Sequence, residues 1–139
     1  MAEPTWIATR MLCDPQGGPD VEVRIGIPAV LEQPDCWECP FALVEAGKEP
    51  VLDAGHGTDA FQALIQALEG IRVGLVNTGR PLTWIYMEPG FTGFTRLIPF
   101  IFGLESVREM ESFVEKTIDR QAREIMEGKR QIPQGPPIS

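Results

Sequence analysis

Residues 57–81 constrain the fold more than any other part of the chain, because they contain a helix together with its start and stop signals. Asp59 is followed three residues later by Gln62, which is the spacing of a reciprocal N-terminal cap. Gly79 suits the left-handed residue beyond a helix end, and Pro81 prevents continuation. Apolar residues recur between these signals at helical spacing: Phe61, Leu64, Ile65, Leu68, Ile71 and Leu75. We therefore expect an amphipathic helix whose apolar face lies on another layer.

Alternating and β-branched segments on both sides of this helix predict the strands of that layer. They span residues 7–13, 21–27, 37–43, 51–54 and 82–87. Pro40 cannot donate to a strand ladder, so its amide side should face an edge or a bulge. Apolar residues recur at helical spacing again from Leu104, which predicts a long amphipathic helix ending near Gly128.

These elements predict an α+β fold in which an antiparallel sheet of four or five strands is covered on one face by two helices. A chain of 139 residues with 43% hydrophobic residues suits one core, so we expect a single two-layer domain over residues 1–128. Residues 129–139 contain three prolines and no periodicity, and they are expected to form a flexible Pro/Gly-rich tail.

The charge of the chain is concentrated in its first half. Residues 14–59 hold ten acidic side chains against two basic ones, an excess of eight that equals the net charge of −8. Such acidity disfavours nucleic acid and favours a basic protein as the partner, although solubility alone would also account for it.

No segment has the features of a membrane span or of an export signal. The longest apolar run, residues 97–102, contains Pro99 and is far shorter than the roughly 20 residues that a span needs. The first residues lack both a basic region and an apolar segment. We expect a cytoplasmic protein with no membrane partner and with reduced cysteines.

Cys36 and Cys39 have the spacing of a metal or redox pair, and Cys13 with His56 would complete a zinc set. Residues three apart on a strand point to opposite faces, however, and therefore cannot share an ion. A redox pair would instead begin a helix, whereas the residues after Cys39 continue an extended pattern. A small buried cysteine explains Cys39 better, and we predict no metal and no cofactor.

Asp53, His56 and Asp59 form the one place in the sequence where an imidazole has carboxylates close by. They predict an acid/base site only if the fold brings them together, and Asp59 is already expected to cap a helix. The enzyme alternative is a small hydrolase or metal-dependent enzyme that uses these residues with the cysteines. We predict instead that the chain has no catalytic residues.

A protein-binding surface is the alternative that the charge pattern favours. Glu22 and Glu38 alternate with core residues, so they should share the exposed side of the sheet, with Asp35 and Glu45 near its rim. Phe91 and Phe94 lie in a loop that is too glycine-rich for regular structure, and they would serve either as interface anchors or as core. These six residues are the predicted contacts with a basic partner.

Three motifs carry a resemblance to a known family. They are Trp37-Glu38-Cys39-Pro40, the helix-bearing run of residues 57–72, and Leu82-Thr83-Trp84. The chain resembles the domain of unknown function 6968, a family of short uncharacterised bacterial proteins, over roughly residues 5–125. The resemblance implies a structural role for these motifs and transfers no activity to any residue.

Small size, acidity and the lack of a catalytic motif together predict a non-enzymatic binding protein of the bacterial cytoplasm. Within that class, we expect an immunity-type protein that neutralises a basic toxin or effector, because opposite charge speeds encounter and apolar anchors slow release.

Overall fold

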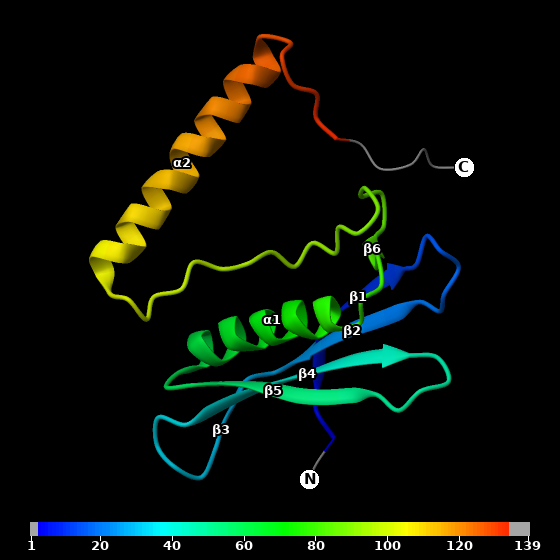
Figure 1. Ribbon diagram of the computed structural model, residues 1–139. Helices are drawn as coiled ribbons and strands as arrows, with labels where there is room; N and C mark the ends of the chain where they lie inside the picture. Colours follow the sequence, from blue (N-terminus) through cyan, green and yellow to red (C-terminus); the bar gives the residue numbers. More distant parts are fainter. Residues whose placement is uncertain (1–2, 134–139) are drawn as a thin grey trace. The chain divides into compact units, whose positions relative to one another are not determined.

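The computed structural model describes residues 3–133, which fall into two compact units on either side of Thr95. The first unit is an antiparallel sheet with one helix, and the second contains the other helix (Figure 1). The fold class is therefore confirmed as α+β. Each unit is described by itself, and the predicted tail lies outside the described residues from residue 134 onward.

The sheet has six strands, all of which pair antiparallel. Strand β4 is central and pairs with β2, β3 and β5, while β1 joins β2 to β6. The strands are β1 (Trp6–Cys13), β2 (Val21–Gly26), β3 (Ala29–Val30), β4 (Trp37–Glu45), β5 (Val51–Gly57) and β6 (Thr83–Trp84). The sheet exceeds the expected four or five strands because the two-residue strand β3 was not predicted, while β6 is the two-residue part of the strand predicted over residues 82–87.

Helix α1 (Ala60–Asn77) begins and ends where its signals predict. The Asp59 carboxylate accepts a hydrogen bond from the Gln62 N–H at 2.8 Å. The Gln62 side chain reaches back, but to the Thr58 N–H at 2.7 Å, one residue before the cap residue. Gly79 has a φ of 66°, which confirms the left-handed residue beyond the helix.

The buried face of α1 differs from the predicted stripe at its first turns. Ile71 and Leu75 are buried as expected, but Phe61 is 79% exposed and Ile65 is 42% exposed. Ala63 and Ala67 face the sheet instead, because Gly55 on β5 has no side chain and lets the helix backbone approach. The helix therefore lies on the sheet through small residues.

The core of the first unit lies between α1 and the sheet. The odd-numbered side chains of β4 face α1, since Gly70 and Gly74 of the helix approach Phe41 and Leu43. The even-numbered side chains of β4 therefore lie on the opposite face of the sheet. The buried cluster comprises Leu12, Val21, Val23, Ile25, Cys39, Phe41, Leu43, Ala63, Ala67, Ile71, Leu75 and Leu82.

The prediction of a strand over residues 82–87 is wrong beyond Trp84. The Met87 N–H donates to the Trp84 carbonyl at 3.0 Å, and Tyr86 adopts a φ of 66°. This turn ends the pairing of β6 with β1 after two residues. Strand β5, by contrast, continues to Gly57, three residues beyond its predicted end.

The second unit consists of an irregular segment followed by α2 (Leu104–Met126). The predicted long helix is confirmed, and none of its residues is buried. Beyond the helix, the Lys129 N–H donates to the Glu124 carbonyl at 2.8 Å. The Arg130 guanidinium pairs with the Glu124 carboxylate at 2.9 Å and lowers the pKa of that carboxyl. Within the described part of the chain, neither helix is long and apolar enough to cross a membrane.

Candidate functional site

A cavity of about 750 Å³ opens on the face of the sheet opposite α1. The register of β4 and β5 places Glu38 directly opposite His56, and their side chains meet with the imidazole Nε2 3.3 Å from a carboxylate oxygen. Pro40 and Ala54 form the next cross-strand pair on the same face. The alternation of the two strands therefore gives the cavity one polar end and one apolar side.

The N-terminal segment closes one side of this cavity. The Thr5 carbonyl accepts a hydrogen bond from the Ile27 N–H at 2.9 Å, which fixes residues 3–5 beside the end of β2. The full lining is Glu3, Pro4, Thr5, Ile27, Ala29, Glu38, Pro40, Leu52, Asp53, Ala54 and His56. Three of these residues are acidic and none is a lysine or arginine, although the register of Asp53 with Phe41 places the Asp53 side chain on the α1 side of the sheet. The cavity is therefore suited to a cation with an apolar stem.

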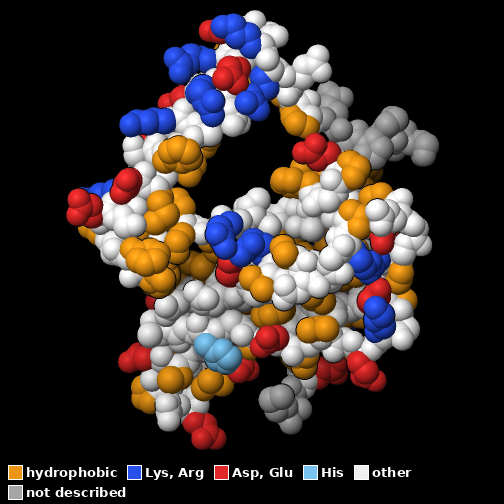
Figure 2. Space-filling model, viewed as in Figure 1, with side chains coloured by type: hydrophobic (Ala, Val, Ile, Leu, Met, Phe, Trp, Pro, Cys, Tyr) orange, Lys and Arg blue, Asp and Glu red, His pale blue; other side chains and the backbone are white. Residues whose placement is uncertain are grey.

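The surface around the imidazole has the same mixed character. Figure 2 shows the chain's single histidine, in pale blue, with acidic and hydrophobic side chains gathered around it. His56 is exposed, and the Glu38 side chain retains 37% exposure. Both groups are therefore accessible to a partner.

The other predicted contacts are dispersed rather than gathered at this cavity. Glu22 lies on the same face of the sheet as Glu38, but it pairs with Arg24 at 2.6 Å. Asp35 lies in the loop between β3 and β4 with a φ of 60°. The structure thus brings Glu22 and Glu38 to one face, as the alternation predicts, and leaves Asp35 in a loop.

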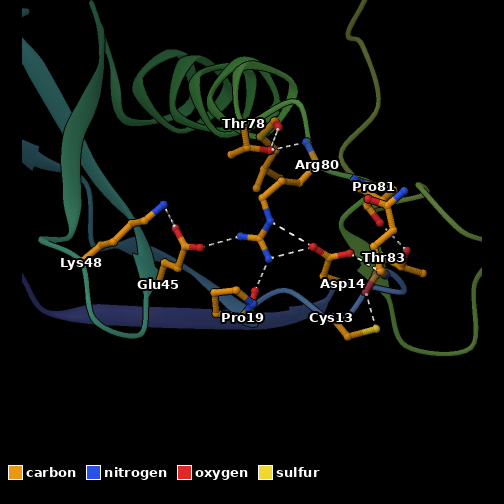
Figure 3. A network of polar contacts seen from close by, with 11 residues as sticks. Cys13, Asp14, Pro19, Glu45, Lys48, Thr78, Arg80, Pro81 and Thr83 are labelled. Carbon is orange, nitrogen blue, oxygen red and sulfur yellow. Dashed lines mark hydrogen bonds and ion pairs between the residues drawn. The ribbon is translucent and has the colours of Figure 1, made fainter.

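Glu45 lies on the α1 side of the sheet, where it belongs to a network around Arg80 (Figure 3). Its carboxylate accepts a hydrogen bond from Arg80 at 2.8 Å, and its side chain is only 18% exposed. The guanidinium of Arg80 also binds the carboxylate of Asp14 at 3.1 Å and the Pro19 carbonyl. The structure therefore gives Glu45 an internal ion-pair partner.

The two phenylalanines of the loop occupy different environments. Phe94 contacts the buried cluster and lies beside the Arg10 guanidinium, whose central carbon is 4.8 Å from the ring centroid. Phe91 retains 36% exposure, and its carbonyl accepts a hydrogen bond from the Trp84 N–H at 2.9 Å. Phe94 is therefore a packing residue, and Phe91 is the more accessible of the two.

Sequence reasoning missed both of the arginines that organise this end of the sheet. Arg10 is the one charged residue in β1, and a lone charge within a strand could have indicated a specific polar or aromatic partner. Arg80 lies between Gly79 and Pro81, immediately after a helix, and gives no such signal. Its partners Asp14 and Glu45 are 66 and 35 residues away in the sequence.

The residues of the enzyme alternative are not joined by hydrogen bonds. His56 bonds to Glu38. The Asp53 carboxylate accepts from the Ala54 N–H, and Asp59 caps α1. Within residues 3–133, no three His, Cys, Asp or Glu side chains come together in a way that could hold a metal ion.

The three cysteines lie in separate environments. Cys39 is fully buried on the α1 side of β4, and its thiol donates to the Gly26 carbonyl at 3.4 Å. Cys13 is exposed near Thr83, and Cys36 is half-buried in the loop before β4. Cys39 and His56 lie on opposite faces of the sheet. His56 pairs with Glu38, and the side chains of the neighbouring residues Glu38 and Cys39 point to opposite faces.

Burial should protect one thiol from alkylation. Burial raises the pKa of the Cys39 thiol, so this thiol stays protonated at pH values where an exposed thiol forms the reactive thiolate. We expect iodoacetamide to modify Cys13 and Cys36 in the native protein and Cys39 only after unfolding. Peptide mass spectrometry after timed labelling measures each site. Equal labelling rates at all three sites would contradict the burial of Cys39.

Comparison with known proteins gives one family and no further relative. No curated protein and no solved structure matches the chain. The family match spans residues 8–96, which covers the sheet and α1 and ends at the boundary between the two units. It is shorter at its C-terminal end than the resemblance over residues 5–125 that the motifs suggested. The chain belongs to the family described as the domain of unknown function 6968.

Proposed function

We propose that this chain is a non-enzymatic protein-binding module of the immunity type, which neutralises a basic bacterial toxin or effector. The observation that carries the proposal is the cavity beside Glu38, whose lining includes Glu3 and Glu38 and no lysine or arginine. A lysine or arginine of the partner would lay its aliphatic stem on Pro40 and Leu52 and direct its charged end to Glu38.

The charges of the whole chain support the same kind of partner. A net charge of −8 attracts a basic protein over a distance of about 10 Å at ordinary salt, and so speeds encounter. The cavity then supplies the short-range contacts that slow release. Exposed apolar side chains on the same face add contact area, since Met11 and Leu52 are 52% and 53% exposed. A cytoplasmic location accords with this role.

Reversing the charge of Glu38 should weaken the complex more than reversing that of Glu22. The Glu22 carboxylate binds Arg24 at 2.6 Å, whereas Glu38 faces the cavity and lies 3.3 Å from the exposed imidazole of His56. With the basic product of the neighbouring gene as partner, we expect Glu38→Lys to lower the association rate about tenfold at low salt and to flatten its salt dependence. Stopped-flow fluorescence measures the rate, and rescue of growth on co-expression measures neutralisation.

Glu49→Lys is the matched control, because it makes the same change in net charge at an exposed residue outside this cavity. The control should slow association less than Glu38→Lys does. An unchanged association rate for Glu38→Lys at low salt would remove the cavity from the binding surface. Failure of the neighbouring product to bind the unmodified chain would count against the immunity role as a whole.

A further inference from the structure

The first unit has an open strand edge along β1. On one side β1 pairs with β2 from Trp6 to Leu12. On the other side only Leu12 and Cys13 pair, with the two residues of β6. No strand within residues 3–95 pairs with the rest of that side. An unpaired edge presents backbone donors and acceptors to which another strand can add.

The hydrogen bonds of β6 indicate which residues face this edge. The Trp84 N–H donates to Phe91 and is not available to Leu12. The hydrogen-bonded pair between β6 and β1 is therefore Cys13 with Thr83. Because backbone groups alternate along a strand, Thr9 and Met11 direct their N–H and C=O groups to the open side, whereas a register shift between Trp6 and Ala8 interrupts the alternation at Ile7. From Ala8 to Met11 the edge contains neither proline nor lysine, the residues that commonly block such pairing, and the register shift of β1 lies before it, between Trp6 and Ala8.

Arg10 supplies a fixed positive charge beside this edge. Its guanidinium carbon lies 3.7 Å from the Trp84 ring centroid and 4.8 Å from that of Phe94. One guanidinium nitrogen donates to the Thr92 carbonyl at 3.3 Å. A Cβ on Gly93 would lie 2.5 Å from the same nitrogen, Arg10 Nη1, so the loop lies directly against the arginine.

The charge of Arg10 has no counterion in the described residues, where it makes no ion pair. Burial lowers the pKa of Arg10 from its usual value, because no carboxylate offsets the loss of water. A guanidinium presents a rigid fork of donors that matches the geometry of a carboxylate or a phosphate. The rings of Trp84 and Phe94 hold the guanidinium plane in place, and its other N–H groups remain to donate to such a ligand.

A cavity of about 550 Å³ lies where β6 leaves the edge, and Arg10 is part of its wall. Its lining is Thr9, Arg10, Met11, Cys13, Asp20, Thr83, Trp84 and Ile85. We propose that the edge of β1 from Ala8 to Met11 binds an extended peptide segment of a partner protein, which continues the line of β6 and pairs an aspartate or glutamate side chain with Arg10. This site is independent of the cavity beside Glu38.

The local charges favour an acidic side chain at this position even though the whole chain is acidic. Between residues 4 and 13 the sequence has no other charged residue than Arg10. Asp20 is the one carboxylate in the cavity wall, and it should oppose the ligand. Asp20→Asn is therefore expected to strengthen binding, which is an effect opposite in sign to that of any general damage to the site.

The experiment begins with a phage-displayed library of random heptapeptides that is selected on the full chain. We expect enriched peptides with alternating β-branched residues and one acidic residue. The best peptide is then synthesised with its acid and with the matching amide, and its affinity is measured by fluorescence anisotropy. Arg10→Gln and the amide peptide should each weaken binding about tenfold, with little further loss when they are combined.

Two further variants separate the edge from the charge. Thr9→Pro removes a backbone donor on the open side and should abolish binding, with its fold checked by circular dichroism. Arg108→Gln on α2 makes the same change of charge as Arg10→Gln at an exposed residue and should leave the affinity unchanged. The proposal is overturned if no peptide is enriched, if the enriched peptides lack an acid, or if Arg10→Gln binds them as tightly as the unmodified chain.

Discussion

Replacing Gly55 by alanine should lower the free energy of unfolding of the sheet and α1 by about 3 kcal/mol. A Cβ at this residue would lie 2.7 Å from the Cα of Ala67 and even closer to the backbone of Ala63 and Ala67. Backbone atoms of a helix cannot move aside as a flexible side chain can, so the whole helix must shift. Urea unfolding followed by circular dichroism measures the loss as a lower midpoint.

Gly47→Ala separates this packing effect from the general cost of replacing a glycine. Gly47 has a φ of 81° and open space around its Cα, so alanine there meets backbone strain and no neighbour. We expect a loss of about 1 kcal/mol for this control. Similar losses for the two variants would show that α1 does not approach β5 as closely as the structure describes.

Gly55 also illustrates what the sequence could and could not predict of the fold. The cap at Asp59 and the left-handed Gly79 follow from residues close in sequence, and both are found as expected. The buried face of α1 depends instead on a glycine in another strand. Because the approach of β5 selects Ala63 and Ala67 over Phe61, an amphipathic pattern read from the helix alone chose partly wrong residues.

The candidate site shows the same division between local and long-range information. Strand alternation correctly placed Glu22 and Glu38 on one face, because the side-chain period of a strand is a local property. It could not show that Arg24 pairs with Glu22 or that His56 lies opposite Glu38, since the second depends on strand register. The cavity itself was beyond the sequence, because four separate segments form its wall.

Replacing Arg80 by methionine should destabilise the first unit by about 3 kcal/mol. Methionine keeps much of the apolar stem but leaves the Asp14 carboxylate, with 5% side-chain exposure, without its cation, and leaves the Glu45 carboxylate, with 18%, paired only with the exposed Lys48 among its ion pairs in the described residues. Figure 3 shows that Arg80 ties the end of α1 to the β1–β2 loop and to the end of β4. Chemical unfolding with urea gives the change in stability.

Lys48→Met tests whether the burial of the network, rather than the loss of one positive charge, causes the effect. Lys48 pairs with the same carboxylate of Glu45 at 3.1 Å, but its own side chain is 69% exposed. Solvent screens such a pair, so we expect a loss of no more than about 0.5 kcal/mol.

Neutralising both acids in the Arg80→Met background, by Asp14→Asn and Glu45→Gln, should recover part of the stability because it removes the buried charges that have lost Arg80. If the neutralised variant is less stable than Arg80→Met alone, unpaired charge is not the source of the loss, and the packing of the arginine stem against its neighbours accounts for it instead.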